Sequence, residues 1–418
     1  MENLATKKPI AIVGAGIVGV STAIWLQRAG HRVILVDRAG PGEGASYGNG
    51  GVLASAAIVP VTVPGLLNKA PGMLLSSNQP LFLKWSYLPR LAPWLMRYLS
   101  HATTDEARRI ASAIHAIIGD SLADHQALSE GTDAAKWVVP SDYIFLYRDR
   151  AHFEGDAFGW DIRRHHGFDW DELEGAALRA YDPVYAPANS FGIRLKDHGR
   201  IADPGRYVKD LAAHAEKNDA RILKAHVDDF VIENGTVTGL RAGGETIDCA
   251  GVVLTTGVWS KELAKKLGVN VPLESERGYH PELWEPSVMP RSPAMIAAAK
   301  FVVTPMEGRL RLAGIVEFGG LDAPPSRAPF DLLMRNIRAA IPDLIWTETR
   351  EWMGHRPTPS DSIPLIGPAP KLRNAWLGFG HHHVGLTGGP KTGRLLAQMI
   401  SGQMPNIDLS PYAPARFS

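Results

Sequence analysis

Cysteine, charge of a single sign and long apolar runs are all scarce in this chain of 418 residues. Cys249 is the only cysteine, so we expect no internal disulfide and no cysteine-based metal cluster. The 44 basic and 43 acidic residues form no long run of one sign, so we expect no nucleic-acid partner. The sequence contains no stretch of about eighteen apolar residues, so we expect no transmembrane helix. These absences leave the class of ordinary globular proteins, and the length of the chain predicts two domains.

The lone cysteine suits a reducing compartment, so we expect a cytoplasmic protein. The segment 87–99 carries aromatic and basic residues that suit a membrane interface, so peripheral contact with the inner face of a membrane stays open. Pro89 and Pro93 argue against a long regular amphipathic helix there. Homo-oligomer formation also stays open.

Glycine, by contrast, is plentiful, and its first cluster lies between two apolar runs. Residues 10–13 form a short apolar run, 17–29 have helical spacing, and 32–36 form a second apolar run that ends at Asp37. Strand, tight glycine turn, helix and strand in this order predict a parallel doubly wound sheet.

Each glycine of this turn has a separate use in binding a dinucleotide. Gly14 permits the turn, Gly16 lets a pyrophosphate approach the backbone, and Gly19 lets the helix pack on the sheet. The helix N-terminus offers N–H groups to the phosphates, and Asp37 can accept hydrogen bonds from a ribose. The turn therefore predicts a dinucleotide site.

Two more glycine-rich segments, 40–51 and 378–393, lie outside this turn and favour FAD over NAD. Glycine lets a backbone approach a ligand closely, and a plain NAD enzyme would not need these segments. We expect a helix from about Pro390 to Ser401, with its N-terminus facing the flavin ring, where it would stabilise negative charge. The small residues 255–257, after a buried strand at 251–254, would also fit against the cofactor.

His381, His382 and His383 do not predict a metal site. Consecutive side chains point in different directions, and no cysteines or acidic pair accompany them. We expect one or two of these histidines to line the flavin or substrate pocket. Elsewhere, Asn234-Gly235 predicts a hairpin turn, and 271–350 predict an antiparallel sheet separate from the parallel one.

Several motifs resemble one known family when they are taken together. The run from Trp352 through Gly354, Arg356-Pro357, Asp361 and Gly367, with Gly380-His381 and Thr392-Gly393-Arg394, resembles the C-terminal signature of the D-amino-acid oxidase/dehydrogenase superfamily. Segments 46–51, 277–280 and 313–318 resemble its branch of D-amino-acid dehydrogenase small subunits. The resemblance runs from Ile10 to Phe417.

The resemblance implies an α/β fold with an FAD-binding Rossmann-like doubly wound domain and a substrate domain built on a mostly antiparallel sheet and helices. We assign 1–60, 195–270 and 351–418 to the FAD domain, and 61–194 and 271–350 to the substrate domain. It further implies non-covalent FAD and oxidation of the Cα–N bond of an amino acid, with hydride transfer to flavin N5. The imine product would hydrolyse to an oxo acid and an amine or ammonia.

The resemblance also assigns roles to residues. Arg356 would hold the carboxylate of a small amino-acid-like substrate, because a guanidinium binds a carboxylate bidentately. Tyr279, His280 and His383 would contact the substrate. The expected cofactor residues are Gly14, Gly16, Ile17, Val18, Gly19, Asp37, Arg38, Ser46, Asn49, Gly50, Gly51, Val227, Thr256, Gly257, Gly380, His381, Gly385, Leu386 and Thr387.

Two alternatives stay open. The substrate could be a secondary amino acid, such as an N-substituted glycine or a D-proline-like or iminodiacetate-like compound; the histidines beside Arg356 would suit a second carboxylate. The chain could instead be a flavin-binding subunit without turnover of its own, although the intact Arg356 and Tyr279 weigh against this. The sequence leaves the electron acceptor open between oxygen and a quinone or other carrier.

Overall fold

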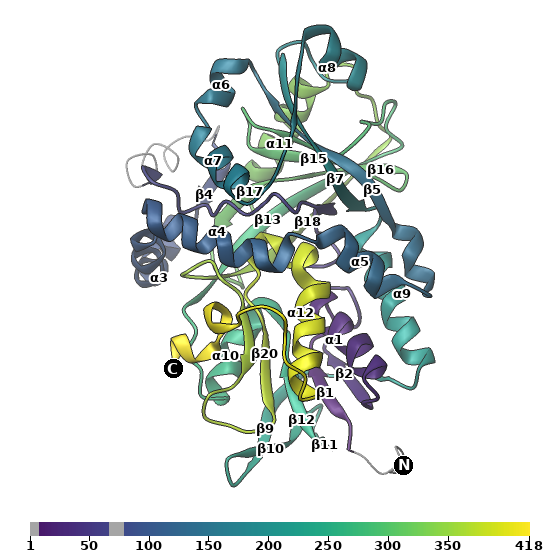
Figure 1. Cartoon of the computed structure of the whole chain (residues 1–418), viewed down its shortest axis with the longest axis vertical. Helices are drawn as coiled ribbons and strands as arrows, with labels where there is room; N and C mark the ends of the chain where they lie inside the picture. Colours follow the sequence, from purple (N-terminus) through teal and green to yellow (C-terminus); the bar gives the residue numbers. More distant parts are fainter. Residues whose placement is uncertain (1–7, 67–78) are drawn as a thin grey trace.

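The computed structural model describes residues 8–66 and 79–418. A small, mostly parallel sheet forms the lower half of Figure 1, and a large, mostly antiparallel sheet forms the upper half. The central strands of the small sheet, β1 (Ile10–Val13) and β12 (Gly251–Leu254), are short apolar runs buried on both faces, as a parallel sheet requires. In spatial order the strands of the small sheet are β19 (Leu365–Pro368), β20 (Ala375–Phe379), β12 (Gly251–Leu254), β1 (Ile10–Val13), β2 (Val33–Asp37) and β8 (Arg221–Lys224).

The large sheet has eleven strands. Its longest pairing joins β13 (Leu273–Trp284) to β18 (Glu348–Pro359), which run antiparallel along their whole length. The other strands of this sheet are β3 (Val52–Leu53), β7 (Phe191–Ile201), β5 (Val138–Tyr147), β14 (Ala294–Ile296), β15 (Phe301–Met306), β16 (Arg309–Ala313), β17 (Ile315–Phe318), β4 (Leu81–Leu83) and β6 (Asp171–Glu174). A third sheet of β9 (Val227–Glu233), β10 (Thr236–Ala242) and β11 (Glu245–Asp248) contains the predicted hairpin at Asn234-Gly235.

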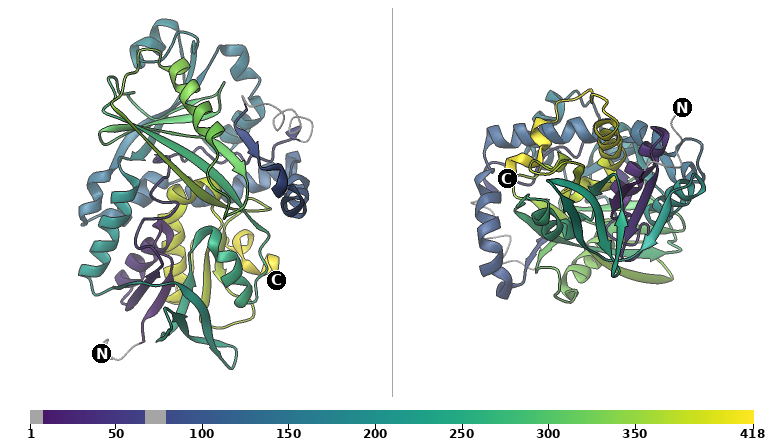
Figure 2. Two further views of the ribbon diagram at one scale, coloured as in Figure 1. Left: turned by 180° about the vertical axis from the view of Figure 1, so that it is seen from behind. Right: turned by 90° about the horizontal axis from the view of Figure 1, so that it is seen from below.

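Helices cover the outer faces of both sheets. Seen from behind, α11 (Arg327–Ala340) lies across the large sheet, and its buried side chains join the core on that face (Figure 2). The other α-helices of the described residues are α1 (Ile17–Arg28), α3 (Leu88–Ser100), α4 (Thr104–Ile118), α5 (Ser121–Ser129), α6 (Arg150–Glu154), α7 (Ala157–His165), α8 (Gly175–Tyr181), α9 (Pro204–Lys217), α10 (Ser260–Lys266) and α12 (Gly385–Ile400).

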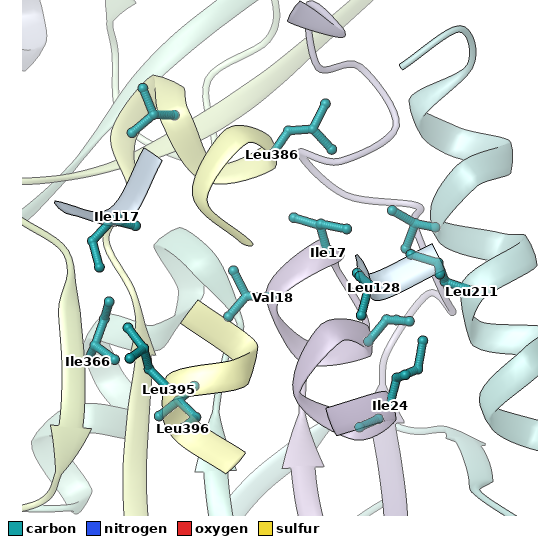
Figure 3. Close-up of a cluster of buried hydrophobic side chains, with 14 of the residues drawn as sticks. Ile17, Val18, Ile24, Ile117, Leu128, Leu211, Ile366, Leu386, Leu395 and Leu396 are labelled. Carbon is teal, nitrogen blue, oxygen red and sulfur yellow. The ribbon is translucent and has the colours of Figure 1, made fainter. Parts of the chain in front are cut away.

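Helices α1 and α12 pack closely in the core of the small sheet, where Ile17, Leu386 and Leu395 belong to one apolar cluster (Figure 3). Glycine makes this contact possible. A Cβ on Gly393 would lie 2.6 Å from the Cβ of Ser21, and the contact leaves no room for it. The last glycine-rich segment therefore brings two helices together as well as lining a cavity.

The expected start of this last helix at Pro390 is wrong, because α12 begins five residues earlier at Gly385. Proline inside a helix leaves the carbonyl four residues before it without its usual donor. Here the freed carbonyl of Leu386 accepts a hydrogen bond from Nε2 of His125 at 2.9 Å. Nδ1 of His125 then accepts from the Tyr207 hydroxyl at 2.8 Å. Tertiary contacts thus let the helix continue through both glycine and proline.

The expectation that Pro89 and Pro93 argue against a long regular amphipathic helix is also wrong, because the 13-residue helix α3 contains both. Pro89 lies in the first turn, where its missing N–H costs nothing. The apolar side of α3 packs on the large sheet, where the Trp94 ring lies 5.6 Å from that of Phe318 and its Nε1 donates to Thr358 O at 3.1 Å. This packing outweighs the tendency of proline to interrupt a helix.

The predicted fold class, a doubly wound α/β part with a second, mostly antiparallel sheet, is confirmed. Among the described residues, no helix is long and apolar enough to cross a bilayer. The predicted domain ranges include 1–7 and 67–78, which lie outside the described residues. The division at 194/195 and 350/351 stays a prediction, and strands β7 and β18 run across it.

Candidate functional site

A cavity of about 720 Å³ extends from the first glycine turn to the paired strands β13 and β18. This volume is typical of small-molecule and cofactor sites. Its lining contains most of the predicted cofactor residues: Gly14, Gly16, Ile17, Val18, Asp37, Arg38, Ser46, Asn49, Val227, Thr256, Gly257, Gly380, His381, Gly385 and Leu386. We call the part around Gly14, Gly16, Asp37 and Ser46 the glycine end. The arginine end is the part around Gly278, His280, Trp352, Arg356 and His383.

The glycine end is shaped by backbone that comes too close for side chains. Gly14 has a φ of +105°, and a Cβ there would lie 2.7 Å from Thr255 O. A Cβ on Gly19 would lie 1.9 Å from Gly14 O. Gly19 does not line the cavity, and it acts by letting α1 approach the turn. These contacts follow the expected uses of the two glycines.

Two polar side chains hold the glycine end in place. Oδ2 of Asp37 accepts from Ala15 N at 2.9 Å, and Oγ of Ser46 accepts from Ile17 N at 3.0 Å. The Ser46 bond joins the start of α1 to the second glycine-rich segment. At the same end, the Arg38 guanidinium lies 4.0 Å from the centre of the Trp259 ring, and both residues line the cavity. No motif in the sequence marks Trp259 as part of the site.

Three other predicted cofactor residues lie away from the cavity walls. Gly51 has a φ of +73°, and a Cβ there would lie 2.9 Å from Ile201 O, so its glycine serves the approach to β7. Gly50 makes only an ordinary contact, 3.5 Å from Ala313. Thr387 lies on α12 and donates to Val52 O at 3.4 Å. These positions support the loop and helix around the cavity.

The arginine end is built on the cavity-facing side of β13 and β18. Strand pairing places Gly278 opposite Gly354, and His280 opposite Trp352. Because side chains alternate along a strand, these residues share one face. Gly278 leaves space for its neighbour Arg356, since a Cβ at 278 would lie 2.6 Å from the guanidinium carbon.

Arg356 is fixed in this space by two hydrogen bonds. Its Nη1 donates to Ile315 O at 3.0 Å, and its Nη2 donates to Nε2 of His280 at 3.1 Å. Burial lowers the pKa of Arg356, and the nearby Glu276 carboxylate opposes this shift. Arginine remains charged at neutral pH in such surroundings. The cavity therefore contains a positioned cation with N–H groups left to bind an anion.

His280 acts as an acceptor for Arg356. Burial, followed by the charges of Arg356 and Arg311, lowers the pKa of His280 well below its usual value. Its Nδ1 is buried without a hydrogen-bond partner, and the backbone of Gly48 opposes the lowering of the pKa. His280 thus helps to hold Arg356 in place at the cavity.

The three consecutive histidines have different surroundings. Nε2 of His381 is paired with the Thr392 hydroxyl at 2.9 Å, and burial lowers the pKa of His381 to about 4. His382 is buried, whereas the side chain of His383 is open to the cavity. The described residues contain no group of three or more His, Cys, Asp or Glu side chains placed to hold a metal ion.

Comparison with known families assigns the chain to a defined group of proteins. A family model described as "FAD dependent oxidoreductase" matches residues 9–399. The chain belongs to this family. It is 37% identical over 415 residues to a D-amino-acid oxidase of Bradyrhizobium diazoefficiens, a match that covers 98% of each chain. It is 30% identical to D-amino acid dehydrogenase 2 of Ralstonia nicotianae, covering 97% of this chain and 100% of that one.

The fold has solved counterparts. Glycine oxidase from Geobacillus kaustophilus superposes with a TM-score of 0.75 at 20% identity, covering 98% of this chain and 99% of that chain. The predicted family resemblance and the prediction of FAD are confirmed. The residues fit this cofactor, because the cradle at Gly16, where a Cβ would lie 3.3 Å from Ser46 Oγ, opens on the cavity beside Asp37. Cys249, the lone cysteine, is buried in the core and does not line the cavity.

The structure places Tyr279 away from the cavity, on the opposite face of β13. Its hydroxyl donates to Oε2 of Glu317 at 2.5 Å and accepts from Ser326 N at 3.0 Å. Its ring packs against Phe330 of α11. Burial and Glu317 raise the pKa of Tyr279 to about 12. The alternation of side chains along β13 directs Gly278 and His280 to the cavity and Tyr279 to the core.

Several contributors to the site were not predicted. Arg311 is buried and donates to Tyr47 O at 2.9 Å and Asn49 O at 2.6 Å, which ties the second glycine-rich segment to the large sheet. Its charge is paired with Glu282. Trp352 lies against Gly48 and Gly354 and forms a wall of the arginine end. No local motif marks Arg311, because its backbone partners in the second glycine-rich segment are more than two hundred residues away.

Proposed function

We propose that the chain oxidises the Cα–N bond of a D-amino acid, with Arg356 as the carboxylate anchor. The observation that carries the proposal is the positioned guanidinium in the cavity that the FAD-binding turn also lines. The names of the oxidase and dehydrogenase relatives support D-amino acids as the substrates. Two ends of one cavity would then hold cofactor and substrate side by side.

The protein's own residues perform the binding and orienting steps. Arg356 pairs with the substrate carboxylate through the N–H groups that Ile315 and His280 leave free. A carboxylate fixed at two points restricts the direction in which the Cα–H bond points, and orientation of this kind is a large part of catalysis. Trp352 forms one wall of the space beside the carboxylate.

FAD would be held at the glycine end by the N-terminus of α1, by Asp37 and by Ser46. The positive N-terminus of α12 also opens on the cavity, since Gly385 and Leu386 line it. The chemistry that FAD supplies when bound is acceptance of a hydride from Cα. The substrate is converted to an imine, which hydrolyses to an oxo acid and ammonia.

An anaerobic visible spectrum of the purified flavoprotein tests this function. We expect D-amino acids to bleach the flavin band, and L-amino acids and N-substituted glycines to leave it unchanged at the same concentration. Readmission of air then separates an oxidase, whose band returns quickly, from a dehydrogenase that needs another acceptor. A preparation that carries flavin and is bleached by no amino acid would overturn the proposal.

Arg356→Met tests the anchor itself. Loss of a bidentate charged contact should weaken the response to D-amino acids on the order of 100-fold or more, while FAD stays bound. Arg350→Met is the matched control, because Arg350 lies on the same strand with an exposed side chain paired to Glu348. Equal responses of the two variants would contradict the assigned role of Arg356.

A further inference from the structure

Glu274 is a buried carboxylate in the wall of the cavity. The residue is 7% exposed and lines the cavity. The Tyr87 hydroxyl donates to both of its carboxylate oxygens at 3.1 Å, and Ser275 N donates to its Oε1 at 2.8 Å. Lys261 is the cation whose charge acts on Glu274, but the Lys261 Nζ donates to Leu273 O at 3.1 Å. Within the described parts of the chain, Glu274 has hydrogen-bond donors and forms no ion pair.

The groups around Glu274 suit its ionised form. Burial and the Glu274 carboxylate raise the pKa of Tyr87 to about 12, so its hydroxyl keeps its hydrogen at neutral pH and donates it. Burial raises the pKa of Glu274, and the bonds from Ser275 and Tyr87 oppose this shift. A buried carboxylate without a paired cation has an unfavourable desolvation energy, which a bound cation would offset.

Glu274 lies on the same face of β13 as the arginine end. Side chains alternate along a strand, and the cavity is lined by Glu274, Gly278 and His280. Glu276, between them, is buried opposite Arg356 and does not line the cavity. The guanidinium of Arg356 lies beside Gly278, and four residues along a strand span roughly 13 Å. One wall of the cavity therefore carries a cation and an anion separated by a distance of this order.

This separation suits a long amino acid with a cationic side chain. In extended free lysine, roughly 7 Å separate the carboxylate carbon from the terminal nitrogen, and a hydrogen bond adds roughly 3 Å at each end. The sum matches the interval between the positions of Arg356 and Glu274. A short side chain would leave Glu274 without a partner.

We propose that Glu274 binds the cationic side chain of a D-amino acid, such as D-lysine or D-arginine, whose carboxylate is held by Arg356. The proposal rests on the function proposed above and specifies the class of substrate that its site prefers. The two ends of the substrate carry opposite charges, and the cavity wall presents the complementary charge to each. A buried site that pairs with a charged group discriminates strongly against analogues that lack it.

The same arrangement disfavours a second carboxylate, which the histidines beside Arg356 left open in the sequence. Burial lowers the pKa of His280 well below its usual value and the pKa of His383 to about 4. Both rings are neutral at neutral pH and offer no positive charge to a second carboxylate. An acidic side chain that extended along the wall would instead approach the negative charge of Glu274. We therefore expect D-glutamate to be a poor substrate.

The test compares ligands that differ only at the end far from Arg356. 6-Aminohexanoate, hexanoate and adipate have chains of one length that end in a cation, a methyl group and an anion. None has an amine at Cα, so none is a substrate of the proposed reaction, and the flavin absorbance of the FAD-loaded protein measures their binding. We expect 6-aminohexanoate to bind about 10- to 100-fold more tightly than hexanoate, and adipate to bind least tightly. Equal affinity for the three ligands, or a preference for adipate, would overturn the proposal without any variant.

Chain length tests the spacing of the two charges. 4-Aminobutanoate is too short to reach from Arg356 to Glu274, so it should bind within about threefold of butanoate. A gain from the amine of 4-aminobutanoate as large as that of 6-aminohexanoate would contradict the assigned partner, because the cation would then be bound nearer to Arg356.

Variants assign the preference to Glu274. Glu274→Gln removes the charge and keeps the shape, so 6-aminohexanoate should fall to the affinity of hexanoate, and hexanoate should stay within about twofold. Glu274→Asp keeps the charge and should retain part of the preference. A parallel loss for both ligands in Glu274→Gln would show a merely structural role and contradict the proposal. Glu351→Gln is the matched control, because Glu351 pairs with Arg327 and does not line the cavity.

Turnover separates this inference from the proposed function. D-Lysine and D-norleucine have side chains of similar length with and without the charge, and we expect D-lysine to bleach the flavin with a kcat/KM about 10- to 100-fold higher. Equal values for the two would overturn the role of Glu274 and still support oxidation of D-amino acids. Bleaching by neither would contradict the proposed function, and the ranking of the inert ligands would then decide the role of Glu274 by itself.

Discussion

The two ends of the cavity are built in different ways. The glycine end consists of backbone, and its key residues, Gly14 to Gly19, Asp37 and Ser46, are near one another in the sequence. The arginine end consists of side chains brought together by the pairing of β13 with β18. The first is determined by close approach of backbone atoms and the second by which face of a strand each side chain occupies. Mutations should therefore break the two ends in different ways.

The largest effect is expected at the glycine end, from Gly19→Ala. The new Cβ would lie 1.9 Å from Gly14 O and 2.8 Å from Thr255 Oγ1, so α1 or the turn must move. Because FAD depends on both, we expect the variant to purify without the flavin band and without activity. Absorbance of the purified protein measures the loss.

Gly50→Ala is the control for this change. Gly50 lies in the second glycine-rich segment, where its Cβ would make only an ordinary contact of 3.5 Å with Ala313. We expect this variant to keep FAD. Loss of flavin from Gly50→Ala, or its full retention in Gly19→Ala, would show that the glycine end does not depend on close backbone approach.

The same substitution at the arginine end should have an intermediate effect. In Gly278→Ala the Cβ would lie 2.6 Å from the Cζ and Nη2 atoms of Arg356, so the guanidinium must shift. A displacement of this size can cost on the order of 100-fold in rate when it disturbs substrate alignment. We expect FAD binding to be unchanged and KM for a D-amino acid to rise by about 10- to 100-fold. Flavin content and steady-state kinetics on one preparation separate the two ends.

The contrast also explains what could be predicted from the sequence. The glycine turn, Asp37 and the segment 255–257 depend on local order along the chain, and the structure places them together on the cavity. Tyr279 was assigned to the pocket because the motif containing it belongs there. The choice between the two faces of β13 depends on its pairing and on Glu317, 38 residues further along. Because successive side chains along a strand point to opposite faces, an error of one residue places a side chain on the wrong face of the sheet.

Helix α12 shows the same limit for helices. The preference of proline for the first helical position placed the expected start at Pro390. The structure begins the helix at Gly385 because Gly389 and Gly393 allow α1 to approach, and His125 satisfies the carbonyl that Pro390 leaves free. The buried Arg311 was missed for a related reason, since its backbone partners lie in a distant loop. Both features depend on contacts that only the folded chain makes.

The smallest kinetic effect is expected from Tyr279→Phe, which separates the two faces of β13. The hydroxyl bonds to the buried carboxylate of Glu317, which also pairs with Arg277 at 3.0 Å. Its loss should lower the free energy of unfolding by about 1.5–3 kcal/mol, as for a hydrogen bond to a charged group, and leave KM unchanged. Tyr185→Phe is a matched control, because the described residues provide no hydrogen-bond partner for that buried hydroxyl, and its loss should cost little. Denaturant unfolding and steady-state kinetics measure both quantities. A rise in KM for Tyr279→Phe without loss of stability would indicate that Tyr279 acts in the substrate pocket. The division of β13 into a cavity face and a core face would then be wrong.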